Sequence, residues 1–246
     1  MSAIFQIAYD VVLEARRNSF FWLSVFLAVL LVSLFAILSG TNPDFRFEKF
    51  LRNGLSMVWL IHLGLALLVT TETIYGEDNR LSIYFYLSRD IDRFSYLLGK
   101  FFGCWVTLLI SLFMSFIVMT FVGGTLVGFE EKIALSFIFI AWELSLSIAI
   151  IIIISRFFSK ILTYFLFGVI LVGSNFIEFF ILNGTSGIEF VMTSLPSYKY
   201  YSYIELIVDN QFPQIWQYMM ILSLFTICVS GTIMCLANFK FNKQYL

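Results

Sequence analysis

The most informative stretch of this chain is residues 76–100, which read GEDNRLSIYFYLSRDIDRFSYLLGK. It is the longest charged stretch in a sequence that is 60% hydrophobic as a whole. Two apolar runs flank it, residues 55–75 and 98–122, and each has the roughly 20 residues that a helix needs to cross a bilayer. A membrane protein that gathers its charges in one short internal segment is expected to use that segment to contact a soluble partner.

The composition predicts a membrane protein without enzyme chemistry of its own. Charged residues make up 13% of the chain, against about 25% in soluble domains, and the mean hydropathy is +0.92. The net charge of −1 argues against a nucleic-acid partner. Cys104, Cys228 and Cys235 lie in apolar runs without metal-ligand spacing, so we expect neither a disulfide nor a zinc site. With a single histidine, we find no nucleophile–base set.

Six apolar segments qualify as spans, so the predicted fold is an all-α membrane protein with one transmembrane domain over residues 1–246. The spans run approximately over residues 20–39, 55–75, 98–122, 133–155, 161–182 and 215–237. Residues 1–18 form an amphipathic pattern, which predicts a helix lying in the membrane interface; the alternative is a cytoplasmic extension of the first span. Its polar face holds Gln6, Asp10 and Glu14, and its apolar face holds Ile4, Ile7, Val11 and Ala15.

The distribution of Lys and Arg predicts the orientation. With the N-terminus inside, ten of the fifteen basic residues fall on the inner side, as the positive-inside rule requires. We therefore expect a multi-pass protein of the cytoplasmic (inner) membrane with both termini and the 76–97 segment in the cytoplasm. The outer segment 183–213 is long, apolar and rich in tyrosine, which predicts a re-entrant or interfacial segment.

The charged segment itself has the features of a docking surface. Ser88 is placed as a helix N-cap, and Asp90 and Asp92 suit the first turn that would follow it, so we expect a helix from Arg89 into the third span. Arg89 and Arg93 are one turn apart and could bind carboxylates of a partner. The alternative is that these charges are solvated and only anchor the segment at the lipid headgroups.

A family resemblance rests on the same residues. The run ETIYGED at 72–78, then LSR at 87–89 and YLLGK at 96–100, resembles the signature of the membrane (permease) subunits of type-2 ABC exporters. In that family a glutamate-rich end of the second span leads into a short cytoplasmic helix, and Ser-Arg and Gly-Lys precede or open the third span. The sequence departs from the family where Asn79-Arg80 replaces the usual Gly-Thr and where no proline precedes Ser88.

The resemblance implies a transporter subunit driven by another protein. Two copies, or this chain with a paralogue, would form the transmembrane unit, with lipid around it. Two cytoplasmic ABC ATPase subunits would dock below and bind ATP and Mg, and an accessory protein could join on the periplasmic or extracellular side. The chain lacks a GxxxxGK[ST] phosphate loop, so we expect it to bind no cofactor itself. The residues expected to couple it to the ATPase are Glu72, Glu77, Asp78, Arg80, Ser88, Arg89, Asp92, Arg93, Lys100 and Arg156.

Four polar residues inside the predicted spans are candidates for a substrate path: His62, Glu143, Asn175 and Glu178. Ionisable groups in a span are costly and often functional. The alternative is that each is neutral or hydrogen-bonded and only fixes helix packing. The leading function is therefore an exporter of a hydrophobic or amphiphilic substrate. The alternatives are an ion- or proton-coupled transporter that uses Glu143 and Glu178, and a non-transporting membrane scaffold.

Overall fold

The computed structural model describes residues 3–17, 22, 25–26, 29–30, 47–80, 91–123, 129–181 and 212–244. Within these ranges the chain is helical apart from residues 91–92 and the turn at Phe158–Ser159, and it contains no strand. A membrane offers no water to the backbone, so helices, which bond their own backbone groups, are the expected form. The helices are α1 (Ala3–Arg17), α3 (Phe47–Arg80), α5 (Arg93–Gly123), α6 (Phe129–Phe157), α7 (Lys160–Ile181) and α10 (Phe212–Gln244).

Three of the described helices are long and apolar enough to cross a membrane, which indicates a membrane protein. The qualifying segments are Gly54–Gly76 in α3, Arg93–Phe121 in α5 and Ala134–Phe157 in α6. They coincide within a few residues with the predicted second, third and fourth spans. Shorter apolar segments, Lys160–Leu171 and Ser223–Phe239, lie in α7 and α10. Most of the predicted first span (20–39) and of the outer segment (183–213) lies outside the described residues.

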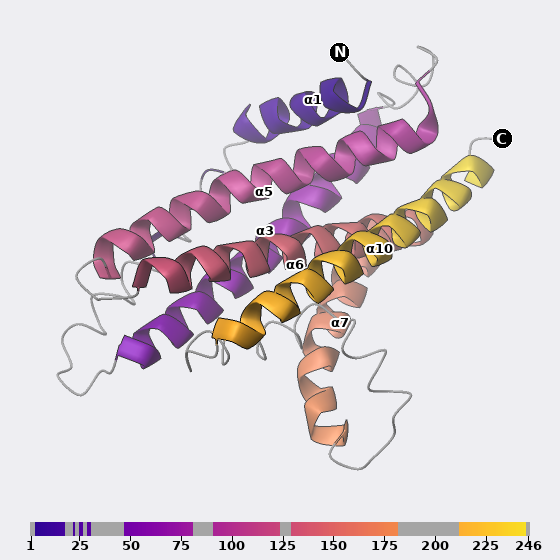
Figure 1. The fold of residues 1–246 in the computed structure, drawn as a ribbon. Helices are drawn as coiled ribbons and strands as arrows, with labels where there is room; N and C mark the ends of the chain where they lie inside the picture. The colour runs from indigo at the N-terminus through magenta and orange to yellow at the C-terminus, as the bar shows by residue number, and fades with distance from the viewer. Residues whose placement is uncertain are drawn as a thin grey trace.

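The long helices α3, α5, α6 and α10 form one bundle around a shared apolar core (Figure 1). Tyr75, near the end of α3, contacts the end of α6, which shows that α3 and α6 run in the same direction. α5 runs the opposite way, so that its first turns lie beside the C-terminal half of α10. Fully buried leucine and isoleucine side chains from α3, α5 and α6, such as Leu63, Leu108 and Ile148, fill the interior. α6 is the most buried of the three spanning helices, with 67% of its spanning segment inside the protein.

The N-terminal helix α1 lies along the first turns of α5 (Figure 1). The predicted apolar face is buried here: Ile7 and Val11 are 0% and 1% exposed. They sit directly over Gly99 and Gly103 of α5. A Cβ at Gly103 would lie 2.6 Å from Val11 Cβ, and one at Gly99 would lie 2.7 Å from Ile7 Cβ. Glycine at both positions lets the two backbones approach closely, as in other small-xxx-small helix contacts.

The start of α5 corrects one prediction. Residues 91 and 92 are not helical, so α5 starts at Arg93, and the predicted helix running continuously from Arg89 into the span is wrong. Asp92 caps the helix instead: its side chain accepts a hydrogen bond from the Ser95 amide (3.3 Å), and its carbonyl accepts one from the Tyr96 amide (3.0 Å). Asp92 satisfies backbone donors that have no partner inside the helix. Ser88 and Arg89 themselves lie outside the described residues.

Candidate functional site

The charged-segment end of the bundle, where α3 ends at Arg80 and α5 begins at Arg93, gathers a set of polar contacts. Three side chains on one face of α3 meet three on one face of α7. Within each helix the three residues are one, three and four positions apart, so they lie close together on the helix surface. We call this set the α3–α7 junction; it consists of Thr71, Glu72 and Tyr75 on α3 and Lys160, Thr163 and Tyr164 on α7.

An ion pair forms the most exposed part of the junction. Lys160 Nζ lies 2.5 Å from Glu72 Oε1, and the two side chains are 38% and 52% exposed. The hydrogen bond to Glu72 raises the pKa of Lys160 above its usual range, against a smaller opposing effect of burial. Since the pair is open to solvent, its contribution to stability is small and is reduced by salt. Glu72, which was predicted to take part in coupling, is thus held by the beginning of α7.

The Tyr75 hydroxyl forms the centre of the junction. It lies 2.7 Å from the carbonyl of Phe158, 3.1 Å from the carbonyl of Ser155 and 2.8 Å from Thr163 Oγ1. Both carbonyls belong to the end of α6 and the turn that follows it, where helix carbonyls lack an intrahelical partner. One side chain of α3 therefore contacts the end of α6 and the start of α7 together.

The third link is a hydrogen bond between two hydroxyls. Thr71 Oγ1 lies 2.9 Å from the Tyr164 hydroxyl and also bonds to the Leu67 carbonyl of its own helix at 2.6 Å. Thr71 is fully buried and Tyr164 is half-buried, so this link is partly shielded from water. Along about one helical turn of α3, the junction therefore includes an exposed ion pair and a partly buried hydrogen bond.

Two basic residues that were predicted to contact a partner are buried in the chain. Lys100 is 1% exposed, and its Nζ lies 5.7 Å from the centre of the Tyr96 ring, within the range of a cation–π contact. Arg156, in the last turn of α6, is 4% exposed. A cation at the C-terminal end of a helix is favourable for the helix dipole. In this conformation both side chains belong to the helix packing.

The remaining predicted docking residues that the structure describes lie at the two ends of the charged segment. Arg93 is half-buried in the first turn of α5, and Asp92 is exposed. Glu77, Asp78 and Arg80 lie in the last turns of α3, although their side chains are outside the described set. α3 therefore ends and α5 begins at the same end of the bundle, and residues 81–90 between them lie outside the described residues.

His62 is completely buried between α3 and α5 and is hydrogen-bonded at both ring nitrogens. Its Nδ1 lies 2.7 Å from the Val58 carbonyl, which can only accept, so Nδ1 carries the proton. Nε2 then accepts from Ser111 Oγ at 3.2 Å. This assignment makes His62 a neutral link between two helices, which is the arrangement expected of a packing residue.

Of the predicted substrate-path residues, the structure describes the side chains of His62 and Glu143. Glu143 is buried at 8% exposure in the middle of α6. Asn175 and Glu178 lie in the second half of α7, and their side chains are outside the described set. Among the residues whose side chains are described, no cluster of three or more His, Cys, Asp or Glu could hold a metal ion.

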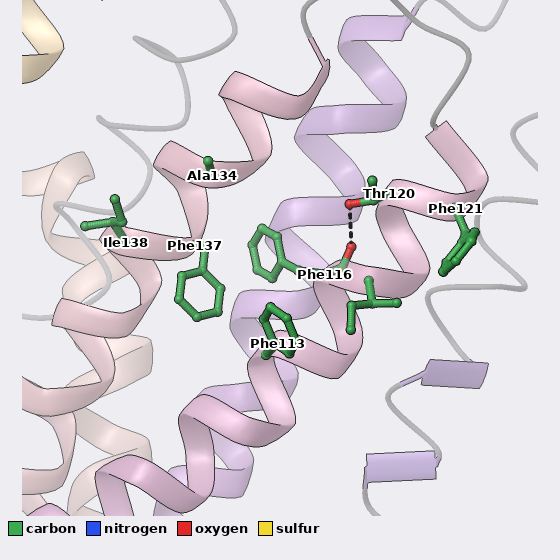
Figure 2. A pocket seen from close by; sticks show the side chains of 8 residues that line it. Phe113, Phe116, Thr120, Phe121, Ala134, Phe137 and Ile138 are labelled. Carbon is green, nitrogen blue, oxygen red and sulfur yellow. Dashed lines mark hydrogen bonds between the residues drawn. The ribbon is translucent and has the colours of Figure 1, made fainter.

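An apolar pocket of about 550 Å³ lies between the second half of α5 and the first turns of α6 (Figure 2). Three rings form its wall: Phe137 meets Phe113 and Phe116 edge to face, with centroids 6.4 Å and 5.5 Å apart. The Thr120 hydroxyl, also in the lining, donates to the Phe116 carbonyl at 2.9 Å. Since this hydroxyl is bonded to its own helix, the pocket offers an apolar guest an almost entirely apolar wall.

Sequence reasoning missed most of the junction and the glycine contact. Thr71, Tyr75, Thr163 and Tyr164 look like ordinary members of apolar helices, and the partners are 88 to 93 residues apart. No local pattern indicates such pairs. The glycines were detectable, because GKFFG at 99–103 is a small-xxx-small sequence in an apolar helix.

Comparison with known proteins adds no family assignment: no family model matches the chain, and no curated protein matches it. The class that the fold defines is an all-helical membrane protein.

Proposed function

We propose that this chain is the transmembrane permease subunit of an ATP-driven ABC transporter that exports or extrudes a hydrophobic or amphiphilic substrate. Six spans would place both termini in the cytoplasm, and a second copy or a paralogue would complete the transmembrane unit. A separate cytoplasmic ATPase would bind ATP and Mg and contact residues 76–100. The support comes from the sequence resemblance at residues 72–100 and from the way the helices enter and leave this segment.

The observation that carries the proposal is the continuity of α3. The helix runs unbroken from Phe47 to Arg80, through the spanning segment Gly54–Gly76 and on into the charged segment. At 1.5 Å per residue its 34 residues measure about 51 Å, against about 30 Å for the hydrocarbon core. Glu77, Asp78 and Arg80 are therefore carried on the same rigid rod as the span. A force applied to them is transmitted into the membrane without an intervening loop.

The other end of the charged segment is equally well anchored. α5 starts at Arg93, immediately after its Asp92 cap, and its first turns are held against α1 by the glycine contacts at Gly99 and Gly103. α3 and α5 thus support residues 81–92 from both sides. This arrangement is expected of a segment that transmits force from a partner protein, rather than of a simple connector between two helices.

The apolar pocket supports the proposed substrate class. Its lining of phenylalanine, alanine and isoleucine from α5 and α6 is suited to an acyl chain or an aromatic group, and it offers no charge to recognise a polar solute. Two further apolar walls, Trp105 and Trp142, line a second pocket of about 370 Å³ nearer the charged-segment end, against α10.

The test is affinity purification of the chain in mild detergent from its native host, with mass spectrometry of the co-purifying proteins and a native mass of the complex. A stoichiometric soluble ATPase is expected. It should be lost when Arg89 and Arg93 are both changed to Glu, and it should remain when the exposed Arg17 of α1 is changed to Glu instead. Recovery without any ATPase, under conditions that preserve other membrane complexes, contradicts the proposal and favours a scaffold.

The second candidate is an ion- or proton-coupled transporter, which the burial of Glu143 in the middle of α6 favours. An intramembrane carboxyl is the usual means of coupling transport to protons. Glu143→Gln separates the two. An ATP-driven exporter keeps its chain-dependent ATP hydrolysis, whereas a proton-coupled carrier loses its proton-driven transport.

A further inference from the structure

The links of the α3–α7 junction that the structure describes lie at the start of α7. The polar links fall at Lys160, Thr163 and Tyr164, in the first five residues of the helix. Further along, α7 buries Phe167 completely, while Phe165 and Val169 are 65% and 49% exposed. Figure 1 shows α7 leaving the other long helices at a steep angle after the turn. Within residues 160–171 of α7, whose side chains the structure describes, directional bonds hold the start of the helix and apolar packing of Phe167 follows.

In the same chain, the contact between α1 and α5 is an example of two helices that are packed too closely to move relative to each other. There, backbone and Cβ atoms approach so closely that a single added methyl group has no room. Apolar packing of that kind interlocks. At Gly168 of α7, by contrast, an added Cβ would meet nothing within 4 Å, so no close contact of this kind fixes α7 among the described residues at that level.

The Tyr75 hydroxyl is bonded on both sides of the turn that separates α6 from α7. A tyrosine hydroxyl has one proton to donate and lone pairs to accept with. The shortest contact, 2.7 Å, is to the Phe158 carbonyl, so the proton goes there, and the hydroxyl accepts from Thr163 Oγ1 at 2.8 Å. The backbone of the turn adds its own bond, from the Thr163 amide to the Ser159 carbonyl at 2.9 Å. Tyr75 therefore holds the turn at its midpoint.

From this geometry we infer that Tyr75 is a positioning residue: it is the pivot through which the end of α3 sets the tilt of α7. A displacement of α3 at the charged segment moves the Tyr75 hydroxyl, and the hydroxyl carries the turn and the first residues of α7 with it. Glu72 and Thr71 keep the first turn of α7 from rotating about this point. The inference deepens the proposed function, on which its purpose rests, because it states which helix the movement of the coupling segment reaches next.

The test measures the tilt of α7 in the full chain reconstituted in lipid nanodiscs. Spin labels are attached at Val169→Cys on α7 and Ile110→Cys on α5, two exposed positions. The background carries Cys228→Ser and Cys235→Ser, since both are exposed, while the buried Cys104 is kept. Pulsed electron spin resonance then gives the distribution of distances between the labels.

Tyr75→Phe removes one oxygen atom and keeps the ring. We expect it to broaden the distance distribution and shift its mean, because the turn loses the hydrogen bonds that Tyr75 makes to it from α3. Tyr9→Phe, at an exposed tyrosine of α1, should leave the distribution unchanged. An unchanged distribution in Tyr75→Phe overturns the inference. Thr163→Val, which removes the second partner of the hydroxyl, should change the distribution in the same direction as Tyr75→Phe and guards against a folding defect in one variant.

An exchange of charges provides the rescue. Glu72→Lys alone should disturb the distribution by placing two cations together, and the double variant Glu72→Lys with Lys160→Glu should return it toward the parent. No rescue by the double variant contradicts the role given to the pair. These measurements need no ATPase, so their failure is distinct from failure of the proposed function, which the co-purification reports.

Discussion

The close contact between α1 and α5 gives the most specific quantitative prediction. Gly103→Ala places a methyl group 2.6 Å from Val11 Cβ and 3.0 Å from the Ala8 carbonyl oxygen, and neither atom can rotate away. Ordinary contacts begin at 3.4 Å, so α1 must retreat by the difference, 0.8 Å. Overpacking of this kind costs about 1–3 kcal/mol. Alanine also stabilises a helix by about 1 kcal/mol relative to glycine, which would hide part of that cost in the single variant.

A matched control removes the propensity term. Gly64→Ala in α3 makes the same chemical change where an added Cβ meets nothing within 4 Å. Because the gain in helix propensity is common to both variants, the difference between them isolates the packing cost of about 1–3 kcal/mol. In a chain of 246 residues, each kcal/mol corresponds to roughly 2–4 °C in the melting temperature.

The assay is thermal unfolding of both variants in the same detergent, followed by tryptophan fluorescence. Gly103→Ala should melt below Gly64→Ala, and Gly103→Leu should melt lower still, because a larger side chain forces α1 further away. Equal melting temperatures for the two alanine variants would refute the reasoning, since they would mean that α1 does not rest on Gly103.

Two further predictions follow from the hydrogen bonds. Ser111→Ala removes the donor to Nε2 of the buried His62 and should destabilise the protein by about 0.5–2 kcal/mol. Ser115→Ala, which loses only a hydrogen bond to its own helix at 3.3 Å, should cost less. Unfolding in detergent compares the two variants, and an equal cost would exclude the assigned bond between Ser111 and His62. Because Glu72 raises the pKa of Lys160, the stabilisation that the Lys160 charge provides is complete below the usual lysine pKa of 10.5 and is lost only as the pH rises beyond that value. The difference in melting temperature between the parent and Lys160→Gln should thus be constant from neutral pH to about 9. A decline within that range would contradict the pairing.

The sequence allowed the spanning helices to be predicted but not the contacts between their ends. Hydropathy alone locates α3, α5 and α6, because a bilayer demands long apolar runs whatever their neighbours are. The start of α5 was misplaced because Ser88 and Asp92 are both good cap residues, and the apolar spacing of Ile91, Phe94 and Leu98 fits either choice.

The junction could not be predicted for a different reason. Its members come from helices that are distant in the sequence, and their hydroxyl groups look the same as those that bond to their own helix, such as Thr73 to the Val69 carbonyl. Only the crossing of α3 and α7 distinguishes Tyr75 from such residues. The face of α1 that packs on α5 was predicted correctly, although the surface that covers it was expected to be lipid and is in part another helix.

The central claim, that a soluble ATPase contacts the segment between α3 and α5, is tested most directly by photo-crosslinking in the native host. A photoreactive amino acid replaces Asn79, near the end of α3, and in a matched strain it replaces Met114, which is exposed on the second half of α5. The claim predicts that the residue at 79 captures a soluble protein carrying a GxxxxGK[ST] phosphate loop and that the residue at 114 does not. Capture of no such protein at 79, with the chain intact in the membrane, would contradict it.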